Sequence, residues 1–455
     1  MSGLPLISFR RYFDELTDEH IITFEAWTKE AQEKLLPKIL AGKSVFTLEA
    51  CYRKGKTLIL KPDSLGFNHR YNQLTLEKAN QTLALNLDDE LLDLVTQLQD
   101  SNIYFELKPY KKIPVSQKKA VYLCELIAIY EADYDFDTAK ELLKEYKPAD
   151  LLLLAVGYKP DSLSLATRLP QFLPLFQYED KAIHVFMLTP PRYGKTRTAA
   201  ILRSLSSSYL TVFPSPAKLV YDGAKNTYGL TYFYNTLYID EIDKVAGGRR
   251  QDTFKESYEI LLTGMSEGYW LRDVSSKAED FRNVVSFCFM GNSKSKELGN
   301  YTQLSDYSKS ARYKIREMFS YVDNPEAFVE RLAYCEIITE SVQAYKLLNY
   351  SEDKRVMYLH PRVARAVIKL LQDGVKEQPV HRNVECELDH HFNAVKSVLN
   401  VLEVELSDST IESLVRGELT FTDVLVSEEK QGSSIDYEEL RAPDMSEMLF
   451  RDGVS

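Results

Sequence analysis

The chain has 455 residues, a formal net charge of −11 and 44% hydrophobic residues. This length exceeds that of one ordinary domain, and the hydrophobic content suffices for buried cores, so we expect two or three folded domains. The sequence contains no run approaching the roughly 18 apolar residues of a membrane-spanning helix. Its first residues also lack the pattern of a secretory signal. We therefore expect a cytoplasmic protein that makes no contact with a membrane.

The five cysteines are scattered, and none form a C-x-x-C pair. This pattern is typical of buried thiols in a reducing compartment rather than of disulfides or structural zinc. The excess of acidic residues is concentrated after residue 340, while residues 151–340 are nearly neutral. Binding to nucleic acid depends on local charge, so the overall acidity neither favours nor excludes it.

Residues 1–150 combine strand and helix patterns, which predicts a mixed α+β domain. Two strands joined by a basic hairpin tip are predicted at 44–51 and 57–60. The remaining predictions for this domain are a helix at 88–98, strands at 103–107 and 121–129, and a helix at 137–146. Lysines and tyrosines at the loop tips would suit single-stranded nucleic acid, through backbone charge and base stacking. The alternative is an ordinary α+β domain with solvated loops.

A strand-like run from Val185 to Thr189 stops at two prolines and is followed by a helical pattern. A strand, a loop ending in Gly-Lys-Thr and a helix together predict a phosphate cradle. Prolines have no N–H to donate, so the cradle amides must come from the residues after them. The sequence therefore predicts ATP and Mg²⁺ as cofactors, with Thr196 as a Mg²⁺ ligand and a nucleotide-binding loop made of Arg192, Tyr193, Gly194, Lys195 and Thr196.

Two adjacent carboxylates, Asp240 and Glu241, follow an apolar run at 236–239. Charges at the end of a buried strand are costly unless they are used. In a P-loop ATPase, the first acid holds Mg²⁺ and the second polarises the attacking water. We therefore predict Asp240 as a metal ligand and Glu241 as a catalytic residue. The alternative is a strand that ends in a polar turn.

A further apolar strand at 284–290 ends in Gly291-Asn292. Ring ATPases place a polar residue at the tip of such a strand, where it senses the γ-phosphate and orients water. Asn292 is therefore predicted to be catalytic. Taken alone, it would be interpreted as a turn asparagine.

A hairpin is predicted between these two motifs, at 269–284. Its basic residues lie beside Tyr269 and Trp270, a combination that would bind a polymer threaded through a pore by charge and stacking. The predicted DNA-binding residues are Arg272, Lys277 and Arg282. The alternative is a surface hairpin with an aromatic side chain packed beneath it.

An arginine at the start of a later strand-like run, Arg331, is a candidate finger that reaches the γ-phosphate bound by a neighbouring subunit. Arg312 and Arg316 are rival candidates for this role. A helix that begins at Pro361 places Arg362, or alternatively Arg365, in position to contact ATP from a lid.

Taken in order, these motifs resemble those of the AAA+ P-loop ATPases. The resemblance is to the branch that contains the MCM replicative helicases and the Lon-like AAA+ protein of BREX phage-defence systems. It runs from Gly157 to Ile338 and departs from the family pattern where Thr189 replaces the first loop glycine. It implies a hexameric ring that encircles DNA and couples ATP hydrolysis to movement, with Arg331 as the finger. No Lon-type protease domain is expected, because the C-terminal part offers no serine–lysine dyad.

The predicted architecture is α/β, with a parallel-sheet AAA+ core at 151–340 behind the N-terminal domain at 1–150. A helical lid with helices at 385–403 and 408–415 is predicted within 341–430, followed by an acidic tail at 431–455. The predicted function is a DNA-dependent ATPase, a helicase or translocase in replication or phage defence. The alternatives are a protein remodeller and an assembly platform that uses ATP only to close a ring.

Overall fold

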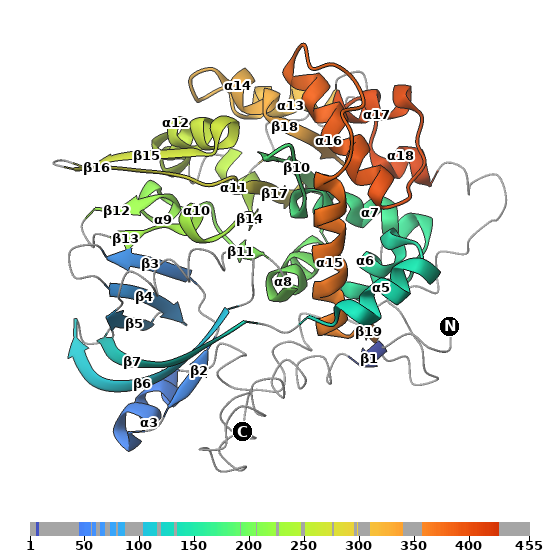
Figure 1. The fold of residues 1–455 in the computed structure, drawn as a ribbon. Helices are drawn as coiled ribbons and strands as arrows, with labels where there is room; N and C mark the ends of the chain where they lie inside the picture. The colour runs from blue at the N-terminus through green and yellow to red at the C-terminus, as the bar shows by residue number, and fades with distance from the viewer. Residues whose placement is uncertain are drawn as a thin grey trace.

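The computed structural model is shown in Figure 1. It describes residues 6–8, 45–55, 57–60, 64–68, 73–78, 81–86, 103–115, 120–131, 134–191, 193–205, 207–223, 227–246, 251–274, 277–294, 298, 310–339 and 357–426. The predictions at 88–98, Arg192 and the tail at 431–455 lie outside these residues.

The centre of the molecule is a five-stranded sheet in the order β11-β14-β17-β10-β18, in which every pairing is parallel. The sheet and its surrounding helices confirm the predicted α/β class with a P-loop ATPase core. The strands are β10 (His184–Thr189), β11 (Ser208–Leu210), β14 (Thr236–Ile239), β17 (Ser286–Asn292) and β18 (Leu332–Ile337).

Both faces of this sheet are covered, because all six residues of β10 are buried. Successive side chains of β10 point into different hydrophobic clusters. Phe186 and Leu188 join the cluster that extends to the N-terminal sheet. Val185 and Met187 join the one formed with the C-terminal helices. The continuous apolar run in the sequence is thus a central strand between two cores.

Parallel strands need long connections, and helices supply most of them here. The helices of this part of the chain are α5 (Phe136–Glu145), α6 (Pro148–Ala155), α7 (Ser162–Phe172), α8 (Lys195–Leu205), α9 (Pro216–Leu219), α10 (Leu230–Phe233), α11 (Ile242–Ala246), α12 (Gln251–Glu267), α13 (Ala311–Met318) and α14 (Pro325–Glu330). A short 3₁₀ turn (Leu173–Leu175) and the small hairpin β8 (Gln177–Tyr178) and β9 (Lys181–Ala182) lead into β10.

The N-terminal part forms a mixed eight-stranded sheet, β12-β13-β3-β4-β5-β7-β6-β2. Its strands from this part are β2 (Leu58–Leu60), β3 (Ser64–Asn68), β4 (Gln73–Lys78), β5 (Gln81–Asn86), β6 (Ile103–Pro114) and β7 (Ala120–Glu131). The predicted first strand at 44–51 is wrong, because α3 (Val45–Lys54) is a helix. Leu48 and Cys51, three residues apart, are both buried, a spacing that a helix also satisfies.

One end of the eight-stranded sheet, and a separate two-stranded sheet, join distant parts of the chain. The hairpin of β12 (Tyr221–Asp222) and β13 (Thr227–Tyr228) leaves the ATPase core after α9 and pairs with β3 at Thr227 and Asn68. Near the N-terminus, β1 (Leu6–Ser8) pairs with β19 (Met357–Leu359), directly before the C-terminal helices. Neither pairing was predicted, since such long-range partners leave no local pattern in the sequence.

The C-terminal helices are α15 (Pro361–Lys376), α16 (Glu387–Val401), α17 (Asp408–Val415) and α18 (Phe421–Leu425). They confirm the helices predicted at 385–403 and 408–415, and α15 begins at the predicted proline. Its N-cap is His360, whose ring accepts a hydrogen bond from the Arg362 amide. α15 packs against α5 and α6, and α18 packs against α7 (Figure 1). α6 also crosses position 150, so the domain limits of the sequence analysis stay a prediction.

The predicted hairpin is present as β15 (Tyr269–Val274) and β16 (Lys277–Arg282), which project on the left of Figure 1. Trp270 is fully buried, and its indole N–H donates to Asn283 O at 2.9 Å. Its ring lies over Gly264 of α12, where a Cβ would come within 2.3 Å of it. The prediction that Trp270 is available for stacking is therefore wrong, and the alternative of a packed aromatic holds for this residue.

Candidate nucleotide site

The three predicted motifs meet at one edge of the parallel sheet. β10 ends at Thr189 before the phosphate loop, β14 ends before Asp240, and β17 ends at Asn292. Because the strands are parallel and adjacent, their carboxyl ends lie together, and Thr189 is directly opposite Asn292 in the register. The polar ends of these strands, separated in sequence, thus form one site.

The phosphate loop has the backbone of a cradle where the structure describes it. Gly194 has φ +84°, a conformation that residues with a Cβ rarely adopt. Lys195 opens α8 and is largely buried, with its ammonium 3.4 Å from Thr189 O. Burial lowers the pKa of Lys195, while the carboxylates of Asp240 and Asp243 oppose that shift. A bound phosphate would favour the charged ammonium in the same way as these acids.

The residues predicted to hold Mg²⁺ are in contact. The Thr196 hydroxyl donates to Asp240 Oδ2 at 2.7 Å, and Tyr209 OH donates to the same oxygen at 3.1 Å. No cluster of three or more His, Cys, Asp or Glu suited to a metal occurs in the described part of the chain. The Thr196 hydroxyl and the Asp240 carboxylate suit Mg²⁺, since this ion is bound by one or two protein oxygens together with water and substrate phosphates. The donor set therefore fits the metal.

Glu241 stands beside this pair in a strained backbone conformation. Its φ is +60°, which is uncommon for a residue with a side chain and is typical of functional sites. Its carboxylate forms an ion pair with Lys244, one turn along in α11, and remains partly exposed. The structure thus leaves Glu241 at the open rim of the site.

Asn292 is tied to helix α11 through Asp243, a residue that the sequence analysis missed. The Asn292 amide donates to Asp243 Oδ1 at 3.0 Å, and the Asn292 side chain accepts from Lys294 N at 3.0 Å. Asp243 is only 4% exposed and lies so close to Gly291 that a Cβ there would come within 2.8 Å of its oxygen. The sequence feature that could have indicated Asp243 is its place as the third acid in the run Asp-Glu-Ile-Asp at 240–243.

The underside of the phosphate loop is formed by two buried residues of α7 that the sequence analysis did not single out. Arg168 donates to Tyr193 O, and its Nη1 donates to Thr198 Oγ1 at 3.1 Å. Gln171 donates to Lys195 O at 2.8 Å. Both side chains are 0% exposed.

The candidate finger Arg331 lies at the opposite edge of the sheet, next to the amino end of β10. It donates to Leu262 O at 3.0 Å and to Ser266 Oγ on α12. Its rival Arg312 donates to the carbonyls of Val415, Val329 and Leu332 and is thus held within its own chain.

The other predicted arginines are in varied surroundings. Arg316 is partly exposed and pairs with Glu326 at 3.2 Å. Arg362 lies in the first turn of α15, and its carbonyl accepts from Asp135 N at 3.2 Å. Arg365, its alternative, is buried in the same helix. The roles of these residues toward ATP stay predictions.

The predicted DNA-binding residues all belong to the β15–β16 hairpin. Arg282 is exposed and lies opposite Tyr269 in the register, and Lys277 opens β16 at the far end. Arg272 donates to Tyr221 O in β12, which joins the hairpin to the eight-stranded sheet. The side chains of Arg272 and Arg282 are described, and that of Arg282 is the more exposed to solvent.

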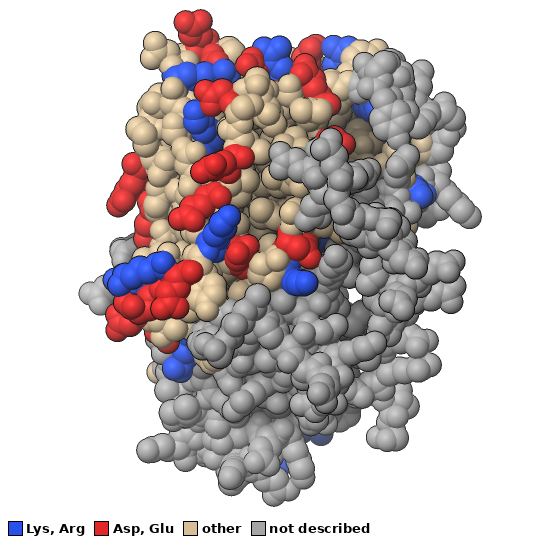
Figure 2. Space-filling view, turned by 90° about the vertical axis from the view of Figure 1, so that its right-hand side faces the viewer, with Lys and Arg blue, Asp and Glu red and all other residues tan. Residues whose placement is uncertain are grey.

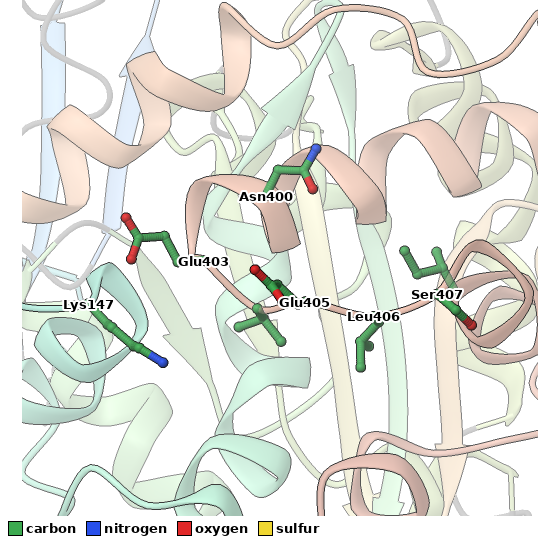
Figure 3. A pocket seen from close by; sticks show the side chains of 8 residues that line it. Lys147, Asn400, Glu403, Glu405, Leu406 and Ser407 are labelled. Atoms are coloured by element: carbon green, nitrogen blue, oxygen red, sulfur yellow. The ribbon is translucent and has the colours of Figure 1, made fainter.

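A surface pocket lies elsewhere, between Lys147 and the turn that joins α16 to α17 (Figure 3). Glu403 and Glu405 are among the residues lining it, and none of them belongs to the phosphate loop or its acids. This pocket is therefore no part of the predicted nucleotide site.

Part of the chain matches a known protein family. Residues 121–335 match the family model described as "Lon-like protease BrxL-like, ATPase domain". The match covers the phosphate loop, both acids, Asn292, the hairpin and Arg331. This part of the chain is thus similar to BrxL-like ATPase domains, as the motif resemblance predicted, and that similarity implies nucleotide binding.

Three viral proteins are similar over most of the chain. "Uncharacterized protein 440" of Sulfolobus islandicus rod-shaped virus 1 is 25% identical over 67% of this chain and 69% of its own length. Acidianus filamentous virus 1 has "Uncharacterized protein ORF426", 25% identical over 74% of this chain and 78% of its own length. "Uncharacterized protein ORF425" of Acidianus filamentous virus 2 is 26% identical over 63% of this chain and 69% of its own length. Their printed names assign no activity.

A buried acid beside the site predicts a pH effect on stability. Glu336 of β18 is fully buried, accepts from Tyr334 OH at 2.9 Å, and has its pKa raised by burial to about 7. Between the ordinary pKa of 4.5 and this value, the folded state binds more protons than the unfolded state. The free energy of unfolding therefore falls as pH rises through that window and stays lower above it.

We expect Glu336→Gln to be more stable than the wild type at pH 8, by on the order of 2 kcal/mol, because it removes a buried charge without changing shape. At pH 5, near the lower end of that window, the difference should shrink to a small part of its value at pH 8. Urea unfolding at both pH values measures this, and an equal difference at both would contradict it.

Proposed function

We propose that this protein is an ATP-driven motor that acts on DNA as an oligomeric ring. The observation that carries the ATPase part of the proposal is the contact between Thr196 and Asp240, with Glu241 beside it and Gly194 and Asn292 at the same sheet edge. The match of residues 121–335 to an ATPase family supports the same conclusion.

In this proposal each group has a separate task. The loop amides and the Lys195 ammonium bind the β- and γ-phosphates, and Thr196 with Asp240 holds Mg²⁺, which neutralises charge on the phosphate oxygens. Glu241 accepts a proton from the attacking water, and Asn292 orients that water. Glu241 must exchange its pairing with Lys244 for a bond to water, which its partly exposed position allows.

The ring proposal rests on the position of Arg331. Arg331 lies at the edge of the sheet where the strands begin, whereas the phosphate loop lies at the edge where they end. An arginine placed there serves a γ-phosphate only if that phosphate is bound by another copy. A second copy in a head-to-tail ring would bring the two edges together.

DNA is the proposed substrate because of the β15–β16 hairpin. Tyr269 and Arg282 lie at its base, Lys277 is near its tip, and the hairpin extends away from the core (Figure 1). On the face carrying the C-terminal helices, acids and bases are interspersed among the described residues (Figure 2). Burial of Trp270 leaves Tyr269 as the one of these two aromatic side chains that could stack on a base or grip a polypeptide.

For hydrolysis, we expect Glu241→Gln to bind ATP with wild-type affinity and to lose turnover by roughly a hundredfold or more, because only proton transfer is removed. Lys195→Ala should lose ATP binding itself. Glu259→Gln, an exposed site on α12, serves as the matched control and should hydrolyse ATP normally. Steady-state phosphate release and ATP binding measure both effects. Normal turnover in Glu241→Gln would exclude its proposed role.

For the shared site, we expect Arg331→Ala to slow hydrolysis by about a thousandfold while ATP still binds. Mixing this variant with Lys195→Ala should restore part of the activity, because some interfaces then combine an intact loop with an intact arginine. A role for Arg331 confined to its own chain predicts no recovery on mixing. The phosphate-release assay, with the assembly state checked by mass, distinguishes the two outcomes.

For DNA, we expect the double variant Lys277→Ala with Arg282→Ala to bind more weakly and to show a shallower salt dependence. The logarithmic slope should fall by about two, one for each lost phosphate contact. Lys369→Ala with Arg416→Ala removes the same charge from α15 and from the C-cap of α17, and should behave as the wild type. Titration of labelled DNA at several salt concentrations measures this. A wild type that neither binds DNA nor changes its ATP turnover with DNA would refute the DNA part of the proposal.

A further inference from the structure

Helix α7, which precedes the phosphate loop in the chain, carries a buried cation that lies beneath the loop. Arg168 of α7 is 0% exposed, and its guanidinium lies 4.9 Å from the ring centroid of Tyr158 and 5.3 Å from that of Tyr193. Its described hydrogen bonds go to neutral acceptors: Thr167 Oγ1, Gln171 Oε1, Thr198 Oγ1 and Tyr193 O. A buried cation without a hydrogen-bonded carboxylate is costly and calls for a reason beyond its electrostatic attraction to the buried Glu336.

The reason lies in which atoms Arg168 and Gln171 contact. Arg168 binds the carbonyl of Tyr193, and Gln171 binds the carbonyl of Lys195 at 2.8 Å. In a trans peptide, a carbonyl and the N–H of the next residue point in opposite directions. Holding these two carbonyls against α7 therefore turns the amides of Gly194 and Thr196 the other way, towards the cradle.

The two side chains are held in place before any ligand arrives. Gln171 accepts from Arg168 Nη1 at 3.0 Å and lies 3.3 Å from Met290 Sδ of β17. Arg168 also binds Thr198 in the first turn of α8. The fixed planar guanidinium thus joins the loop, the helix after it and the helix before it.

We propose that Arg168 and Gln171 are positioning residues that preset the phosphate-binding amides of the loop through its carbonyls. Arg168 adds a buried positive charge that a bound polyphosphate complements. The proposal rests on the nucleotide site described above, but it concerns residues that never touch the nucleotide. It predicts that affinity for the phosphates depends on side chains lying on the far side of the loop.

The test uses the full chain with Mg²⁺, a fluorescent ADP analogue, and inorganic pyrophosphate as a competitor without a base. Arg168→Lys keeps the charge but cannot make the same set of bonds, so the Kd for ADP should rise about tenfold or more. Gln171→Met should raise it about fivefold. Pyrophosphate should weaken by the same factor as ADP in each variant, because the effect acts on the phosphates.

The matched control is Gln372→Met, which removes the same kind of bond, from a glutamine amide to Leu175 O at 2.7 Å, away from the loop. It should keep wild-type affinity for both ligands, whatever its melting temperature. If Arg168→Lys fails to fold, Gln171→Met compared with Gln372→Met decides the question.

The outcomes separate this inference from the proposed function. A wild type that binds no nucleotide overturns the ATPase proposal. A wild type that binds, together with a Gln171→Met variant within twofold of it, overturns the positioning role and leaves the ATPase proposal intact. A loss for ADP without a loss for pyrophosphate also overturns the positioning role, since the defect would then concern the base.

Discussion

The alignment of β10, β14 and β17 in one parallel sheet is the constraint on which this molecule depends. Parallel pairing sets the carboxyl ends of these strands at a common edge, so that Thr196, Asp240 and Asn292 meet although they are far apart in sequence. It also requires each strand to be buried on both faces, and β10 meets this by sending alternate side chains into two different cores. Any change that shifts the register of β10 against β17 would therefore separate the phosphate loop from Asn292.

What the sequence could predict was local. The strand, loop and helix around Gly194, the acids after β14 and the polar end of β17 each leave a pattern within a short stretch, and each lies where that pattern placed it. The residues that support the loop leave no such pattern, because Arg168 and Gln171 act through bonds to distant segments. The helix at α3 was mistaken for a strand because a short run of apolar residues suits both. Burial of Trp270 against Gly264 required the tertiary structure.

The loop is also in contact with the last described helix. Tyr193 OH lies 3.4 Å from Thr422 Oγ1 of α18, and the Phe421 amide donates to Tyr334 OH at 3.1 Å. α18 in turn packs on α7, which carries Arg168. A residue of the loop, the helix beneath it and the end of the C-terminal helices thus form one packed unit around the site, so the phosphate loop and the C-terminal helices are not independent in their stability.

The hairpin of β12 and β13 has a different consequence for how the chain can be divided. It is encoded within the ATPase part, yet it completes the N-terminal sheet by pairing with β3. Separating the chain near residue 150 would leave β3 as an edge with open hydrogen-bonding groups, and β13 paired with β12 alone. Each fragment would expose an edge strand able to pair with other chains. The two halves are therefore better regarded as parts of one folding unit than as modules joined by a linker.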